Sequence, residues 1–169
     1  MPRDMGYAWV LTRGNIMLDI TEYDIRKIYE LGKMSFEDII NDPEASFYFA
    51  KYIKQDRFPE GEEAISKSAE FSYLYAVLLG ERFLAGEEAI SKDPYASYNY
   101  AEDIIEGPFP LGEEAISKRA GLSFWYAMKI IKGPFPLGEE AIRQDPYWSQ
   151  EYDEFLETLS EEDIYIEVD

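Results

Sequence analysis

One pentapeptide, Gly-Glu-Glu-Ala-Ile, occurs four times in the chain, and its spacing constrains the fold more than any other feature. The copies start at Gly61, Gly86, Gly112 and Gly138, which are 25, 26 and 26 residues apart. A degenerate fifth copy begins at Ser35, 26 residues before the first. Self-similarity at such a period is typical of chains in which one small supersecondary unit is stacked repeatedly.

Each repeat predicts two helical segments. The first is the Gly-Glu-Glu-Ala-Ile run, with its glutamates near the helix N-terminus and a lysine near its end, where the helix dipole favours each charge. The second begins with Asp-Pro in the best copies, because Asp is a favoured N-cap and Pro a favoured first helical residue. These lysines are Lys67, Lys92 and Lys118, and the caps are Asp42, Asp93 and Asp145.

The second segment repeats a Ser–aromatic–Ala–aliphatic quartet at offsets 0, +3, +4 and +7, which places all four residues on one helical face. Burying one large apolar side chain contributes roughly 1.5–3 kcal/mol. Ordering a residue costs about 1–2 kcal/mol for the backbone alone, so an isolated unit of this size is unstable and must stack on its neighbours. The quartets are Ser46/Phe49/Ala50/Ile53, Ser72/Tyr75/Ala76/Leu79, Ser97/Tyr100/Ala101/Ile104 and Ser123/Tyr126/Ala127/Ile130.

Glycines mark the expected ends of these helices. Gly80, Gly107 and Gly133 are predicted C-caps, and each following linker carries an aromatic residue that is expected to enter the core. The second unit is one residue short, which predicts a local irregularity at Arg82–Ala85.

The ends of the chain depart from the repeat. Residues 1–20 are predicted to form a β-hairpin of Tyr7–Thr12 and Ile16–Ile20 around a Gly/Asn turn. Residues 21–34 predict a capping helix, opened by a capping box at Thr21. The stack is expected over 35–159, with Glu151–Leu159 still helical and the helix ending before Ser160. The acidic segment 160–169 is a possible strand at Ile164–Val168. The predicted fold is therefore a single, mainly α domain: an α-solenoid of about five short helix-hairpin repeats with a small terminal β element.

The run Arg-Phe-Pro-Glu-Gly-Glu-Glu-Ala-Ile, followed by Asp-Pro-Tyr-Ala-Ser-Tyr-Asn-Tyr-Ala, resembles short tandem helical repeats of uncharacterised tailed-phage and large-DNA-virus proteins. The resemblance covers about residues 35–155, and the period is shorter than the tetratricopeptide unit of about 34 residues. It implies a phage-encoded origin and a role in host takeover or anti-defence. It carries no catalytic residues.

Charge and composition limit the partners and the chemistry that this chain can have. The chain has 16 basic and 35 acidic residues, a net charge of −19, and neither Cys nor His. This argues against direct binding of nucleic acid or of an anionic membrane, and favours a basic, Lys/Arg-rich protein partner. Imidazole and thiolate chemistry is excluded. The absence of Cys suits a cytoplasmic location, in the host cell if the chain is phage-encoded. No segment has the ~20 apolar residues of a membrane span.

Two acidic sets are candidate partner-binding sites. The paired glutamates of the repeats would form a negative ridge with a pitch of about 8–10 Å, either imitating a phosphate backbone or only serving helix ends and solvation. The second set lies in residues 151–169, which carry nine acids and no base. The ridge is Glu62, Glu63, Glu87, Glu88, Glu113, Glu114, Glu139 and Glu140; the tail set is Glu151, Asp153, Glu154, Glu157, Glu161, Glu162 and Asp163.

Aromatic residues offer further candidates. Trp125 and Trp148 are candidates for partner contact or for the core. Apolar residues on another helical face form either an exposed contact surface or, as we expect, a face covered by the terminal hairpin; they are Tyr48, Tyr52, Leu74 and Leu78. The repeated serines are expected to pack, since no His or nucleophile elbow accompanies them. We therefore predict no catalytic residue, no metal site and no cofactor. The expected function is a non-enzymatic inhibitor or decoy that occupies the basic nucleic-acid-binding surface of another protein. The alternative is a structural or adaptor repeat protein that binds a peptide or self-assembles, with its charge serving solubility.

Overall fold

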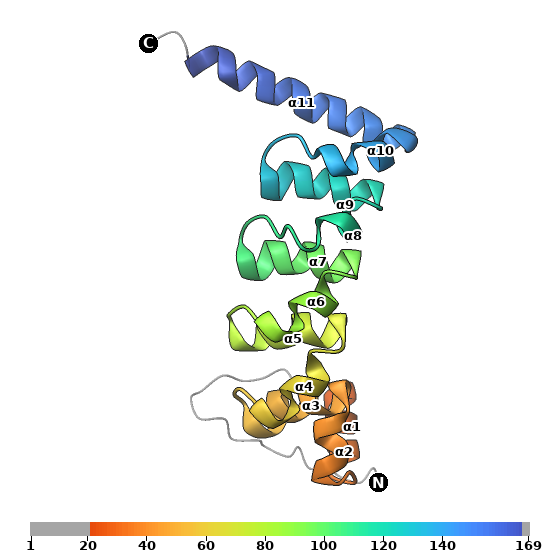
Figure 1. Cartoon of the computed structure of the whole chain (residues 1–169), viewed down its shortest axis with the longest axis vertical. Helices are drawn as coiled ribbons and strands as arrows, with labels where there is room; N and C mark the ends of the chain where they lie inside the picture. Colours follow the sequence, from red (N-terminus) through yellow and green to blue (C-terminus); the bar gives the residue numbers. More distant parts are fainter. Residues whose placement is uncertain (1–20, 167–169) are drawn as a thin grey trace, which may run out of the picture.

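The computed structural model describes residues 21–166, with side chains described for residues 21–159. This part of the chain is mainly helical and contains no strand (Figure 1). The predicted hairpin at residues 1–20 lies outside the described residues. The strand predicted at Ile164–Val168 is wrong for residues 164–166, because the last helix continues through them.

Two helices form the N-terminal end. α1 (Glu22–Leu31) begins at Thr21 and α2 (Phe36–Asn41) begins at Ser35. Each has a complete capping box. The cap side chain accepts from the backbone N–H of an Asp three residues later, and the side chain of that Asp accepts from the backbone N–H of the cap residue. The capping box predicted at Thr21 is thus confirmed.

The following units alternate a short segment with a longer helix. The short segments are η2 (Pro59–Gly61) with α4 (Glu62–Ile65), η3 (Leu84–Gly86) with α6 (Glu87–Ile90), α8 (Glu113–Ile116) and α10 (Pro136–Gln144). The longer helices are α3 (Pro43–Phe49) with η1 (Ala50–Lys54), α5 (Ala69–Leu79), α7 (Pro94–Tyr100) with η4 (Ala101–Ile105), α9 (Ala120–Trp125) with η5 (Tyr126–Ile131), and α11 (Pro146–Ile166).

The Asp-Pro signals open the helices as predicted. The side chains of Asp42 and Asp93 accept from the N–H of the residue three positions later, at 2.7 and 2.8 Å. Asp145 accepts from the N–H groups of Tyr147 and Trp148. These bonds satisfy backbone donors that have no partner inside the helix.

The helix ends differ from the prediction in an informative way. Gly80 has φ +66° and ends α5 as expected. In the other units the residue with a left-handed backbone at the helix end is Gln55, Glu106 or Lys132. Glu106 and Lys132 each stand one position before the predicted C-cap, Gly107 or Gly133. These units end in a π-helical turn that holds one extra residue, and the shorter second unit lacks this turn. The irregularity expected at Arg82–Ala85 is therefore misplaced, because the difference lies within the helix end.

The core repeats in the same way from unit to unit. The serine, aromatic and alanine of each second to fourth quartet are 0% exposed, as is Ile in each pentapeptide. The linker aromatics Phe58, Phe83, Phe109 and Phe135 are at most 2% exposed, which confirms their expected place in the core. Of the predicted inward aliphatic residues, Leu79, Ile104 and Ile130 are partly buried against the core, whereas Ile53 is 52% exposed.

A close approach between backbones joins successive units. A Cβ added to Gly86 would lie 2.5 Å from Ser72 Cβ, and the same contact joins Gly112 to Ser97 and Gly138 to Ser123. Only glycine fits against these buried serines, which donate to an Ile carbonyl of their own unit at 2.7–3.1 Å. The predicted packing role of the serines is confirmed for Ser46, Ser72, Ser97 and Ser123.

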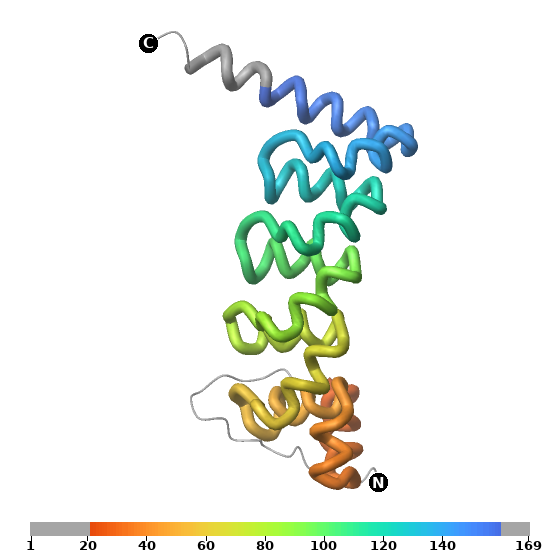
Figure 2. Tube along the Cα trace, viewed as in Figure 1, coloured from red at the N-terminus to blue at the C-terminus, as the bar shows by residue number. Residues whose placement is uncertain are grey.

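The longer helices lie one above another along the long axis of the molecule, and α1 and α2 lie at one end (Figure 1). α11 crosses the other end and extends beyond the helices beneath it. The turns that follow the longer helices come to the same side in successive units, as the tube in Figure 2 shows. α11 is 21 residues long: it begins at the predicted Asp145-Pro146 signal and continues beyond Leu159, where the helix was expected to end.

Candidate partner-binding surface

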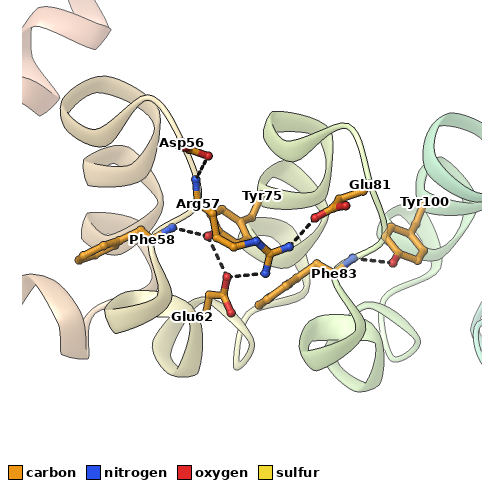
Figure 3. Close-up of polar contacts among 8 residues, drawn as sticks. All are labelled: Asp56, Arg57, Phe58, Glu62, Tyr75, Glu81, Phe83 and Tyr100. Atoms are coloured by element: carbon orange, nitrogen blue, oxygen red, sulfur yellow. Dashed lines mark hydrogen bonds and ion pairs between the residues drawn. The ribbon is translucent and has the colours of Figure 1, made fainter.

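The two glutamates of each pentapeptide have different environments. The first accepts a hydrogen bond from a buried tyrosine hydroxyl of the same unit, at 2.9–3.1 Å, and that hydroxyl also accepts from the backbone N–H of the linker phenylalanine. Figure 3 shows this arrangement at Glu62, Tyr75 and Phe58. The sequence signal for this role is the fixed spacing of 13 residues between glutamate and tyrosine. The other triplets are Glu87/Tyr100/Phe83, Glu113/Tyr126/Phe109 and Glu139/Tyr152/Phe135.

Arginines accompany only the first two of these carboxylates. Arg57 binds Glu62 at 2.8 Å and Glu81, which follows the end of α5, at 2.5 Å (Figure 3). Arg82 binds Glu87 at 2.7 Å. Prolines, Pro108 and Pro134, occupy the equivalent positions before Phe109 and Phe135, so the inward carboxylates of the last units have no arginine at this point.

The second glutamates point outward. The side chains of Glu63, Glu88 and Glu114 are 86–87% exposed, and each binds a lysine four residues later at 2.8–3.1 Å. The hydrogen bond from Lys92 lowers the pKa of Glu88. Glu140 instead accepts from Gln144 at 3.4 Å. The predicted ridge thus contains three glutamate–lysine pairs on its outer side, and its inner glutamates serve the core.

The acids of α11 have no such lysines. The helix contains seven Asp and Glu residues and no base. Asp153 binds Arg143 at 2.6 Å, Glu154 accepts from Gln150, and Glu151 is half-buried. Glu157 is exposed, and the side chains of Glu161, Glu162 and Asp163 lie outside the described ones. Four of these acids stand in the second half of the helix, and Asp163 lies in its last turn, where the macrodipole disfavours negative charge.

Arg143 covers the end of the repeats. It replaces the serine that follows Ile in the other pentapeptide units, and it donates to Ser149 Oγ at 3.1 Å as well as to Asp153. Its guanidinium lies 5.3 Å from the ring centre of Tyr152. A charged group therefore covers the serine against which a further unit would place its glycine, which is how a terminal repeat prevents continued stacking.

The two predicted tryptophans lie together. Trp125 and Trp148 have ring centres 6.3 Å apart, and Trp148 also contacts Phe124 and Tyr147. Trp125 is 37% exposed and Lys129 lies over its ring, whereas Trp148 is half-buried. The pair forms a partly exposed aromatic corner at the start of α11.

Helix α1 covers Tyr48 and Tyr52, and the hairpin expected over them lies outside the described residues. The Tyr48 hydroxyl donates to Tyr23 at 3.2 Å, and the Tyr52 hydroxyl donates to Asp24. Lys27 binds Glu44 at 2.6 Å beside them. The residues of α1 that make these contacts carry no sequence signal beyond helical spacing, and the sequence did not single them out.

Burial and the nearby carboxylates raise the pKa of the network tyrosines. The pKa of Tyr75 and of Tyr100 rises to about 12, first because burial disfavours the phenolate and then through Glu62 and Glu87. These hydroxyls therefore stay protonated near neutral pH and act as hydrogen-bond donors to the glutamates.

The described residues contain no group of three or more acidic side chains placed to hold a metal ion. Between residues 21 and 166, no helix combines the length and apolar character that a membrane crossing requires. No family model, curated protein or solved structure matches the chain.

Proposed function

We propose that the chain is an α-solenoid of about five units that acts as a non-enzymatic binding protein. Its acidic C-terminal helix docks on the basic nucleic-acid-binding surface of another protein, as an inhibitor or decoy. The observation that carries this proposal is α11, whose 21 residues include seven acids and no base. An anionic helix of this kind is steered onto Lys/Arg-rich surface by long-range attraction.

The placement of the acids supports a binding role over solubility alone. An acid in the last turn of a helix costs about 0.3–1 kcal/mol at low salt, and Asp163 stands in that turn of α11, whereas the same charge elsewhere would serve solubility without this cost. The aromatic corner of Trp125 and Trp148 lies at the start of the same helix. It provides a site for local packing after electrostatic encounter, because aromatic anchors dominate many interfaces.

A pull-down from bacterial lysate, followed by mass spectrometry, tests the partner class. We expect nuclease or other DNA-binding proteins that duplex DNA competes off, with affinity falling steeply between about 50 and about 500 mM salt. A single partner that DNA does not displace would contradict the proposal.

Two matched charge variants test which surface binds. One combines Glu151→Gln, Glu154→Gln and Glu157→Gln on α11; the other combines Glu63→Gln, Glu88→Gln and Glu114→Gln, whose carboxylates are already paired with lysines. We expect the α11 variant to weaken partner binding about tenfold, which corresponds to about 0.5 kcal/mol per charge. The control should change it less than threefold. Equal losses would mean that net charge alone matters.

The peptide-binding adaptor remains a second candidate because Trp125 is partly exposed within an aromatic corner. An adaptor of this kind would respond little to salt and strongly to Trp125→Ala. The decoy also uses this corner but must respond strongly to salt, so the salt dependence separates the two functions.

A further inference from the structure

The outward side of α5 is apolar, and the described residues cover it only in part, where Leu74 and Leu78 pack against the core. Leu74 and Leu78 are half-buried, and Val77 is 46% exposed. The opposite side of this helix carries the buried Ser72, Tyr75 and Ala76. Helices that are apolar on all sides are normally enclosed, so this face has the character of a contact surface.

The preceding unit shows what such a face accepts. There, α1 packs on α3. The Tyr23 ring meets Tyr48 at 6.1 Å, Lys27 binds Glu44, and Asp24 faces both the Tyr52 hydroxyl and Lys51, whose Nζ is 3.9 Å away. The surface formed by the longer helix of a unit is therefore one on which another helix can lie.

Because the units repeat, each residue on the outward face of α3 has an equivalent on the outward face of α5. Ser46 and Ser72 are equivalent, so the face of α3 corresponds to that of α5 at an offset of 26 residues. The carboxylate that binds Lys27 is retained, whereas the groups that bind Asp24 become apolar. The equivalent positions are Glu44 and Glu70, Tyr48 and Leu74, Lys51 and Val77, and Tyr52 and Leu78.

These differences define the occupant. An acid at the Asp24 position would lose its partners against Val77 and Leu78, and burying an unpaired charge is costly. An apolar residue there would instead extend the buried surface. A basic residue at the Lys27 position would still find a carboxylate, in Glu70, which is exposed.

We propose that the outward face of α5, formed by Glu70, Leu74, Val77 and Leu78, binds an amphipathic helix of a partner protein. The helix carries two adjacent apolar residues and then Lys or Arg three positions after the second. This is recognition of a helix through an apolar face flanked by charge. It concerns a surface other than α11 and goes beyond the proposed function.

A peptide titration with the full chain tests this specificity. The probe is a fluorescein-labelled peptide of residues 21–34 carrying Asp24→Leu, followed by fluorescence anisotropy. We expect it to bind at least tenfold more tightly than the unmodified peptide and than the peptide carrying both Asp24→Leu and Lys27→Glu. Equal binding of the three peptides would overturn the proposal.

Variants of the chain locate the peptide. Val77→Asp should weaken probe binding at least tenfold, and Glu70→Lys should reverse the preference between the Lys27 and Lys27→Glu probes. Both positions are exposed, so thermal melting should confirm that each variant folds. Binding that ignores both variants would place the peptide elsewhere, for example on the face that α1 covers, and would refute the site. The α11 triple variant should bind the probe normally, so failure here is distinct from failure of the proposed function.

The chain lacks Cys, so single cysteines reveal whether the face is free. We expect Val77→Cys to react with a maleimide at a rate within about threefold of Glu63→Cys, a fully exposed reference. Protection above tenfold that is independent of concentration would mean that another part of the same chain covers the face. Protection that grows with concentration would mean that a second copy does. Either result would overturn the proposal.

Discussion

Removing one tyrosine hydroxyl gives the sharpest test of the network that defines each unit. In Tyr126→Phe, the buried N–H of Phe109 loses its acceptor at 2.7 Å, and Glu113 loses a donor at 3.0 Å. Phe109 is 1% exposed, so water cannot replace the lost acceptor without opening the unit. An unsatisfied buried donor costs about 1–3 kcal/mol. We expect a loss of about 2 kcal/mol, which lowers Tm by about 4–8 °C in a chain of this size.

Urea and thermal unfolding, followed by circular dichroism, measure this loss, and amide hydrogen exchange locates it at Phe109. Tyr147→Phe is the matched control, because Tyr147 is 61% exposed and its ring lies at the surface. It should change stability by less than about 0.5 kcal/mol. If the two variants lose equal stability, or if exchange at Phe109 does not accelerate, the hydroxyl network does not stabilise the units as argued.

Three further predictions concern backbone and ionisation. Gly86→Ala should lower the free energy of unfolding by about 3 kcal/mol or more, because the added Cβ would overlap the preceding helix. Gly80→Ala, whose Cβ meets no atom within 4 Å, should lower it by only about 1 kcal/mol, the strain of a left-handed backbone. Equal losses of stability in urea unfolding would contradict this. Lys132→Gly should stabilise the chain by about 0.5–1 kcal/mol, since its φ is +55°; a lower denaturation midpoint would show otherwise. Stability should be constant from neutral pH to about pH 10 and fall between pH 10 and about 12, by about 1–3 kcal/mol for each of Tyr75 and Tyr100. The reason is that unfolded tyrosines ionise in this range while these two stay protonated in the fold. Unfolding midpoints that do not change over this range would refute the prediction.

The repeat made much of the helical pattern predictable. Asp-Pro caps, buried phenylalanines and packing serines each have a local signal that tertiary contacts do not override. The π turns could not be predicted, because the extra residue is absorbed by hydrogen bonds that depend on the packed helix end. Lys132 has no property that predicts a left-handed conformation, whereas the adjacent Gly133 does, and the prediction followed the glycine.

The candidate site was less predictable than the helices. Adjacent glutamates such as Glu62 and Glu63 are equivalent in sequence, but one faces the core and the other solvent. The spacing of 13 residues from Glu62 to Tyr75 distinguishes the two glutamates, but the fold is needed to show that this spacing brings hydroxyl and carboxylate together. The helical periodicity of the last segment was clear to Leu159, but its continuation through residues 164–166 was missed because Ile-Tyr-Ile has high strand propensity. Propensity of this kind depends strongly on context.

Three separate sequence changes remove positive charge toward the C-terminal end. The arginine that neutralises an inward glutamate becomes proline, the lysine that pairs with an outward glutamate becomes glutamine, and the last helix has no base. Solubility depends on net charge and does not require that charge to collect at one end. Arg143 adds one positive charge at this end, but the three changes together leave the end that carries α11 more acidic, which favours a localised docking surface over a general solubilising role. The changes are Arg57 and Arg82 against Pro108 and Pro134, the three lysines against Gln144, and the composition of Pro146–Ile166.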